Sequence, residues 1–101
     1  LKGAIMGLDD TITEWLHARG SRQLTVDLAK DLARESKSGW FITTHGNAEF
    51  VVGKFAVVKY TPNHVIWRND GQLLIFHSVE SARIFLADEL KVLAPAIFNF
   101  R

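Results

Sequence analysis

Between Trp40 and His77 the chain consists of short apolar runs separated by turn residues, and several runs carry apolar residues at adjacent positions. A strand with one solvated face alternates apolar and polar residues, whereas adjacent apolar positions require cover on both faces of the sheet. Helices elsewhere in the chain can supply part of that cover, but a chain of 101 residues has little material to spare for it. A second copy of the chain or another partner is therefore expected to complete it.

The predicted strands follow the β-branched and aromatic residues, which favour extended backbone. Residues that tolerate turns lie between them, and Asp70-Gly71 is the strongest hairpin signal. A meander of antiparallel hairpins is the simplest path. Gly53 either separates two strands or forms a bulge in one long strand, so the strand count is four or five. The predicted strands are residues 40–44, 49–52, 55–60, 65–68 and 73–77.

Two helices are predicted before these strands. Thr11 and Glu14 form a capping pattern at the start of the first helix, and Gly20 supplies the left-handed residue that ends many helices. The second helix follows Thr25 and ends near residues 36–39, with its apolar residues at helical spacing.

A third helix is predicted after the strands, capped by Ser78 and ended by Pro95. Its apolar stripe of Ala82, Phe85, Leu86, Leu90 and Leu93 is expected to pack on the sheet. The expected fold is thus a single α+β domain over residues 1–101. It has two N-terminal helices, a four- to five-stranded, mainly antiparallel sheet (a meander) and a C-terminal helix packed on the sheet.

Composition excludes several classes of protein. The 12 basic and 11 acidic residues leave a net charge of +1, so no overall field attracts nucleic acid or an anionic membrane. The absence of cysteine excludes disulfides, thiolate metal sites and a cysteine nucleophile. No apolar stretch approaches the roughly 20 residues of a transmembrane helix, so no membrane role is expected and the cytoplasm is the expected location.

No catalytic motif, phosphate-binding loop or metal-binding pattern is present, so no catalytic residue, cofactor or metal is predicted, and no motif identifies a family. His17 lies in the last turn of a predicted helix, where a positive charge is favoured. One alternative is a small-molecule-binding protein or enzyme with a histidine-containing pocket. The pocket residues would be His45, His64 and His77, with Trp15, Trp40 and Trp67 as candidate walls.

A second alternative is a nucleic-acid-binding protein, because basic and aromatic residues interleave on neighbouring predicted strands. Residues 40–78 carry three basic and two acidic residues, which is a weak attraction for phosphates. Burial of both Tyr60 and Trp67 would exclude this alternative. The candidate residues are Lys54, Lys59, Tyr60, His64, Trp67 and Arg68.

The favoured interpretation is a non-enzymatic binding or regulatory module that acts as a homodimer or on another protein. Ile97, Phe98 and Phe100 follow Pro95 and are too apolar for a solvated tail, so they are the predicted interface. The alternative is a monomer in which all of this apolar surface belongs to one core.

Overall fold

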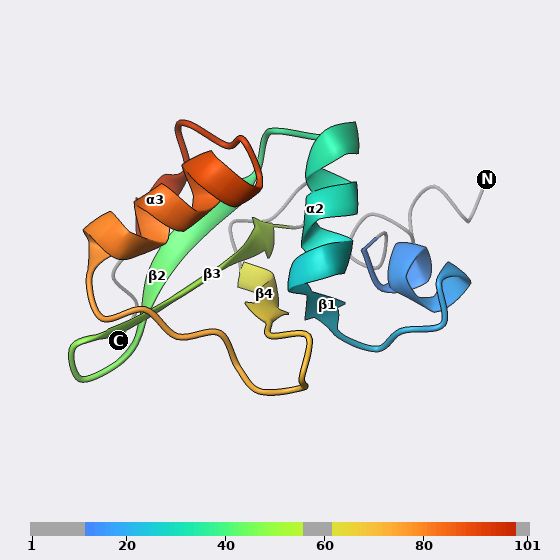
Figure 1. The fold of residues 1–101 in the computed structure, drawn as a ribbon, viewed down its shortest axis with the longest axis horizontal. Coiled ribbons are helices and arrows are strands. Elements are labelled where there is room, and N and C mark those ends of the chain that lie inside the picture. Colours follow the sequence, from blue (N-terminus) through green and yellow to red (C-terminus); the bar gives the residue numbers. More distant parts are fainter. Residues whose placement is uncertain (1–11, 56–61, 99–101) are drawn as a thin grey trace.

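The computed structural model describes residues 12–55 and 62–98 (Figure 1). The α+β class and the order of the three helices agree with the prediction. Thr11, Lys59, Tyr60 and Phe100 lie outside the described residues. The elements in chain order are a helix at residues 12–18, β1 Leu24–Thr25, α2 Val26–Glu35, β2 Trp40–Gly46, β3 Glu49–Phe55, β4 Pro62–Trp67, α3 Val79–Glu89 and β5 Ala96–Phe98.

The strands form one mixed sheet in the order β1-β4-β3-β2-β5, so the predicted meander is wrong in part. β2, β3 and β4 pair antiparallel as expected, whereas β1 pairs parallel to β4 and β5 pairs parallel to β2. The two parallel strands are two and three residues long. Segments of that length have no readable period, so their pairing is decided by where the helices return the chain to the sheet.

The predicted strand at residues 73–77 does not form. The Asp70-Gly71 turn does reverse the chain, since the Arg68 N–H donates to the Gln72 carbonyl and Leu73 lies opposite Trp67. The segment then changes neighbours, because Phe76 exchanges hydrogen bonds with Phe50 of β3. Only two residues, Leu74 and Ile75, lie between these two bridges, which leaves no room for a continuous ladder with either strand.

Local capping signals position the helices as predicted. The Thr25 hydroxyl accepts the Leu28 N–H at the start of α2, and the Ser78 hydroxyl accepts the Ser81 N–H at the start of α3. Gly20 adopts φ +74° after the first helix, where its N–H and that of Ser21 bond back to the last helical turn.

The end of α3 differs from the prediction. The helix ends at Glu89, before Pro95, because Lys91 adopts φ +61° and the Val92 N–H turns back to the Leu86 carbonyl. This turn buries Val92 and leaves Leu93 78% exposed. Leu93 therefore does not belong to the apolar stripe of the helix.

The helices lie on one face of the sheet (Figure 1). α2 contacts β1 and β4, while α3 contacts β2 and β3, so together they span most of the sheet. The core between these layers includes Leu16, Leu24, Trp40, Ile42, Val52, Ile66, Leu86 and Leu90.

The opposite face of the sheet is also closed at its centre. Neighbouring residues of a strand point to opposite faces, yet Phe41 and Ile42 are both 0% exposed. On the Phe41 side, the Phe55 ring packs 4.8 Å from Phe41, and Phe98 meets Phe55 edge-on at 5.0 Å. Burial on both faces is what the adjacent apolar residues of β2 predicted, but Phe41 and Ile42 are already covered within one chain, so these two positions do not require the expected partner.

Gly53 lies within one continuous strand, β3, and not at a break. A Cβ at this position would lie 2.5 Å from the His64 carbonyl oxygen and 2.7 Å from Cζ of Phe41. Glycine is therefore required here by the close approach of β4 and of the Phe41 ring.

Candidate protein interface

β5 brings two of the predicted interface residues to an edge of the sheet. Ile97 pairs with Ile42 and Phe98 pairs with Thr43, so their side chains point to opposite faces. Phe98 is half-buried against Phe55, whereas Ile97 remains 47% exposed although its partner Ile42 is 0% exposed. Phe98 thus anchors the strand, and Ile97 gives its outer surface an apolar character.

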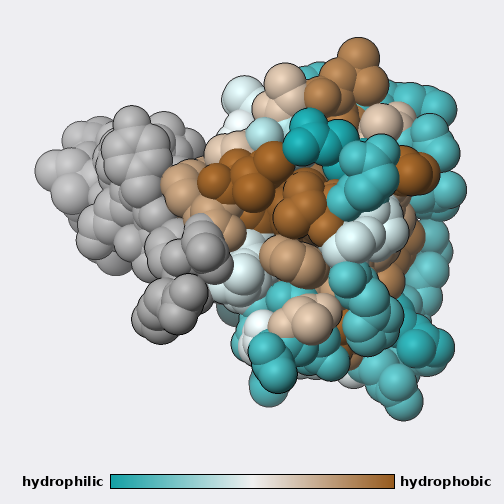
Figure 2. All heavy atoms as spheres, turned by 90° about the vertical axis from the view of Figure 1, so that its left-hand side faces the viewer, coloured by the Kyte–Doolittle hydropathy of each residue, from teal (hydrophilic) through white to brown (hydrophobic). Residues whose placement is uncertain are grey.

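A shallow apolar hollow of about 290 Å³ lies beside β5. Four elements contribute to it, because β2, β3, the first turn of α3 and β5 converge at this end of the sheet. No charged side chain lines it. Figure 2 shows an apolar area in the middle of this face of the molecule. The lining residues are Thr44, Phe50, Val79, Ile97 and Phe98.

The hollow could be predicted only in part. The apolar content after Pro95 identified Ile97 and Phe98, but the sequence analysis missed Thr44, Phe50 and Val79. Each of the three occupies an ordinary strand or helix position, and only the packing of separate elements brings them together. No local pattern marks them as neighbours.

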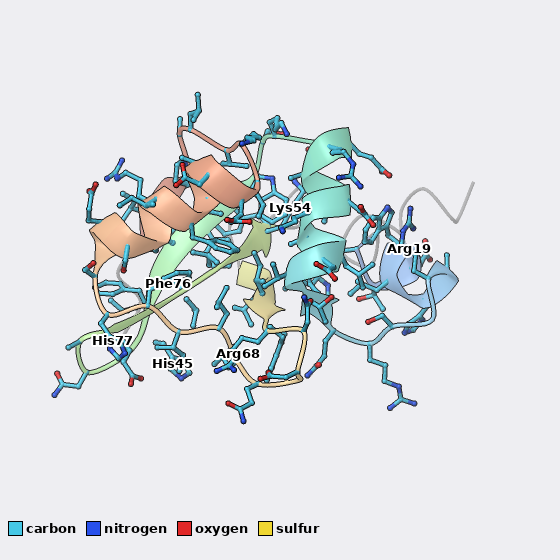
Figure 3. All side chains as sticks on the ribbon, in the orientation of Figure 1. Arg19, His45, Lys54, Arg68, Phe76 and His77 are labelled. Atoms are coloured by element: carbon cyan, nitrogen blue, oxygen red, sulfur yellow. The ribbon has the colours of Figure 1, made fainter. Side chains whose placement is uncertain are left out.

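Of the candidate nucleic-acid residues that the structure describes, Lys54 and His64 are paired neighbours, whereas Trp67 and Arg68 lie apart from them. Lys54 pairs with His64, whereas Trp67 lies three residues further along β4 and so points to the opposite face of the sheet. Trp67 is half-buried. Arg68 is exposed on the following turn, away from Lys54, and forms an ion pair with Asp70 at 2.6 Å (Figure 3).

Lys54 is the described residue whose titration the structure changes most clearly. Its side chain is half-buried beside Trp40, with Nζ 5.4 Å from the ring centre and donating to the Ser38 carbonyl. Burial lowers the pKa of the Lys54 ammonium below its usual 10.5. This lysine is therefore committed to internal contacts and is poorly placed to meet phosphates.

The structure separates His64 from His77, two of the three candidate pocket histidines. His64 pairs with Lys54 and lies 3.2 Å from the Thr13 hydroxyl through Nε2, which ties the first helix to β4. His77 follows Phe76, which pairs with Phe50 of β3, whereas His64 pairs with Lys54 further along the same strand. At a rise of about 3.3 Å per residue, the points of β3 opposite His64 and Phe76 are roughly 13 Å apart. His45 and His77 are exposed and lie at the same end of the molecule (Figure 3).

The three tryptophans likewise do not line one cavity. Trp40 is buried in the core and donates from Nε1 to the Ser36 carbonyl at 3.0 Å. Trp15 lies on the first helix beneath the Arg19 guanidinium, 3.6 Å from the ring centre. Trp67 points to the sheet face opposite Trp40, so each tryptophan serves a different packing region.

Within residues 12–55 and 62–98, no helix is both long and apolar enough to cross a bilayer. Within the same ranges, no cluster of three or more histidines or carboxylates has the geometry to hold a metal ion.

Comparisons with known proteins add no functional information. No family model matches the chain, and no curated protein or solved structure is significantly similar to it.

Proposed function

We propose that this protein is a binding module that associates with a second copy of itself through the β5 edge and the adjacent hollow. The observation that carries the proposal is the 47% exposed Ile97 side chain beside the uncharged apolar hollow. β5 is the last strand in the order of the described sheet, so this apolar surface lies at the margin of the sheet.

The apolar surface at this edge supports the same conclusion. Single exposed apolar residues are ordinary, but apolar patches bordered by polar residues favour association. Ile97 is 47% exposed and adjoins the hollow, so its exposed surface and the lining residues form one patch. Burial of this patch against a partner would remove it from water.

The test is solution mass by light scattering over a wide range of protein dilution. We expect a mass of twice the chain mass at high concentration, falling toward one on dilution. Ile97→Glu should abolish the dimer, because it places two carboxylates in the proposed contact. Ile97 is a better site for the charge than Phe98, whose ring also packs on Phe55.

Leu93→Glu is the matched control, since Leu93 is also an exposed apolar residue but does not line the hollow. It should leave the dimer unchanged, and thermal unfolding should confirm that both variants fold. A monomeric wild-type protein at every concentration would contradict the proposal. A dimer that Ile97→Glu leaves intact would place the contact elsewhere.

A further inference from the structure

We propose that Lys54 is a reactive amine that captures aldehydes by forming a Schiff base at Nζ. Lys54 lies at the end of β3 away from the hollow, and neither Ser38 nor Trp40, which its amine contacts, lines the hollow. Figure 3 shows Lys54 between α2 and α3. The site is therefore separate from the proposed self-association and goes beyond it.

The chain segment that leads into β2 holds the amine in a defined place. Nζ of Lys54 donates to the Ser38 carbonyl at 2.5 Å and lies 5.4 Å from the centre of the Trp40 ring. Gly39 lies between these two residues, and a Cβ on it would be only 3.0 Å from Nζ. Ser38, Gly39 and Trp40 thus surround the amine, and the missing side chain of Gly39 leaves room for it.

The surroundings of Nζ favour the neutral amine over the ammonium ion. The Lys54 side chain is half-buried, and burial removes water that would stabilise the charge. The Ser38 carbonyl and the Trp40 ring attract a cation, but neither carries a full negative charge. Within the described part of the chain no carboxylate pairs with Lys54, whereas Lys30 pairs with Glu89 at 3.2 Å. This uncompensated burial is the cause of the lowered pKa of Lys54.

A neutral lysine amine is a nucleophile, because deprotonation frees its lone pair, and desolvated lysines form Schiff bases with carbonyl compounds. Donation to the Ser38 carbonyl occupies one N–H and leaves this lone pair available. The half-exposed side chain keeps the amine within reach of a small molecule. An aldehyde suits this place because it is uncharged and can approach along the apolar face of Trp40.

The reaction is a condensation that needs no oxidant or reductant. The lone pair of Nζ attacks the carbonyl carbon, the π electrons of the C=O bond move to oxygen, and proton transfer gives a carbinolamine. The carbon–oxygen bond then breaks, and the oxygen leaves as water with the two amine protons while the C=N bond forms. Hydrolysis reverses the reaction, so capture is reversible.

The other described lysines provide controls within the same protein. Lys37 also donates from Nζ to a backbone carbonyl, that of Leu90 at 3.2 Å, and Lys91 donates to the Asp88 carbonyl at 3.0 Å. Both side chains are exposed, whereas Lys54 is half-buried. Access alone would therefore make Lys37 and Lys91 react faster than Lys54. A faster reaction at Lys54 has to come from the state of its amine.

The test is reductive alkylation of the full chain with acetaldehyde and cyanoborohydride at neutral pH, followed by peptide mass spectrometry. Hydride reduces each imine to a secondary amine, which fixes the adduct at its lysine. We expect Lys54 to be alkylated several-fold faster than Lys37 and Lys91 in the folded protein. In concentrated urea, where burial is lost, the three lysines should react at similar rates.

A pH series gives a second measurement. The alkylation rate of Lys54 should hold to lower pH than that of Lys37, because its neutral form persists there. Rates that follow exposure, with Lys54 the slowest, would overturn the proposal, as would parallel pH profiles of the two lysines. An equal preference for Lys54 in urea would assign the effect to the local sequence and would also overturn it. None of these results bears on the dimer, which solution mass tests separately.

Discussion

The replacement Gly53→Ala tests how closely β3 and β4 are packed. The added methyl group would meet three atoms at once, namely the His64 carbonyl oxygen at 2.5 Å, Phe41 Cζ at 2.7 Å and Val65 Cα at 2.9 Å. Two of these atoms are backbone and are held by the pairing of Gly53 with Val65 and of Lys54 with His64. The third belongs to a ring that is 0% exposed.

The expected loss of stability follows from these contacts. Overpacking in a closed core costs up to about 3 kcal/mol, while replacing glycine by alanine within a strand recovers about 0.5–1 kcal/mol of chain entropy. The net loss is therefore about 2 kcal/mol. For a domain of this size that corresponds to a melting temperature lower by roughly 8–16 °C.

The assay is thermal and urea unfolding followed by circular dichroism. Gly46→Ala is the matched control, because its Cβ would meet only the Glu49 carboxylate at an ordinary 3.7 Å. A second variant, Gly53→Ala combined with Phe41→Leu, removes the ring contact but retains both backbone contacts, so it should not restore stability. A free energy of unfolding for Gly53→Ala within about 0.5 kcal/mol of the wild-type value would refute this reasoning, because overpacking costs more than that.

Three other substitutions test single features. The Thr43 hydroxyl is buried without a hydrogen-bond partner, so Thr43→Val should raise the free energy of unfolding in urea by about 1 kcal/mol. Thr44→Val, at the half-exposed neighbouring position, should not raise it. A loss of stability in Thr43→Val would contradict this prediction. Lys91→Gly should raise the free energy of unfolding by about 1 kcal/mol, because glycine adopts φ +61° without the steric cost that lysine carries. An unchanged free energy of unfolding would show that the hydrogen bond from Lys91 to the Asp88 carbonyl offsets this steric cost. Burial lowers the pKa of Lys54, so the unfolded state holds this proton more tightly than the folded state. The free energy of unfolding of the wild type should therefore rise relative to that of Lys54→Met as the pH increases through the alkaline range below 10.5. Parallel pH profiles of the two proteins would contradict the lowered pKa.

Local signals in the sequence predicted the parts of the fold that depend on neighbours in the chain. Thr25 and Ser78 cap helices because their hydroxyls reach backbone N–H groups three residues away. Gly20 ends a helix because it adopts φ +74° readily. The adjacent apolar residues of β2 correctly indicated a strand buried on both faces, since the direction of each side chain follows from the strand itself.

The prediction failed where a distant contact decides the outcome. The segment after Asp70-Gly71 has strand composition, but its two bridges lead to different strands, so no ladder forms. α3 ends before Pro95 because burial of Val92 favours a left-handed Lys91, and this gain comes from the core and not from the local sequence.

The sequence by itself determined the class of the fold, the starts of α2 and α3 and the burial of the central strands, because these follow from interactions within a few residues. Only the tertiary structure decided that β1 and β5 join the sheet parallel to β4 and β2. It alone also assembled the hollow, whose lining comes from four elements between Thr44 and Phe98. The physical reason is that such short strands and such a dispersed lining have no pattern along the chain, and their energy arises from contacts that exist only after the helices have packed on the sheet.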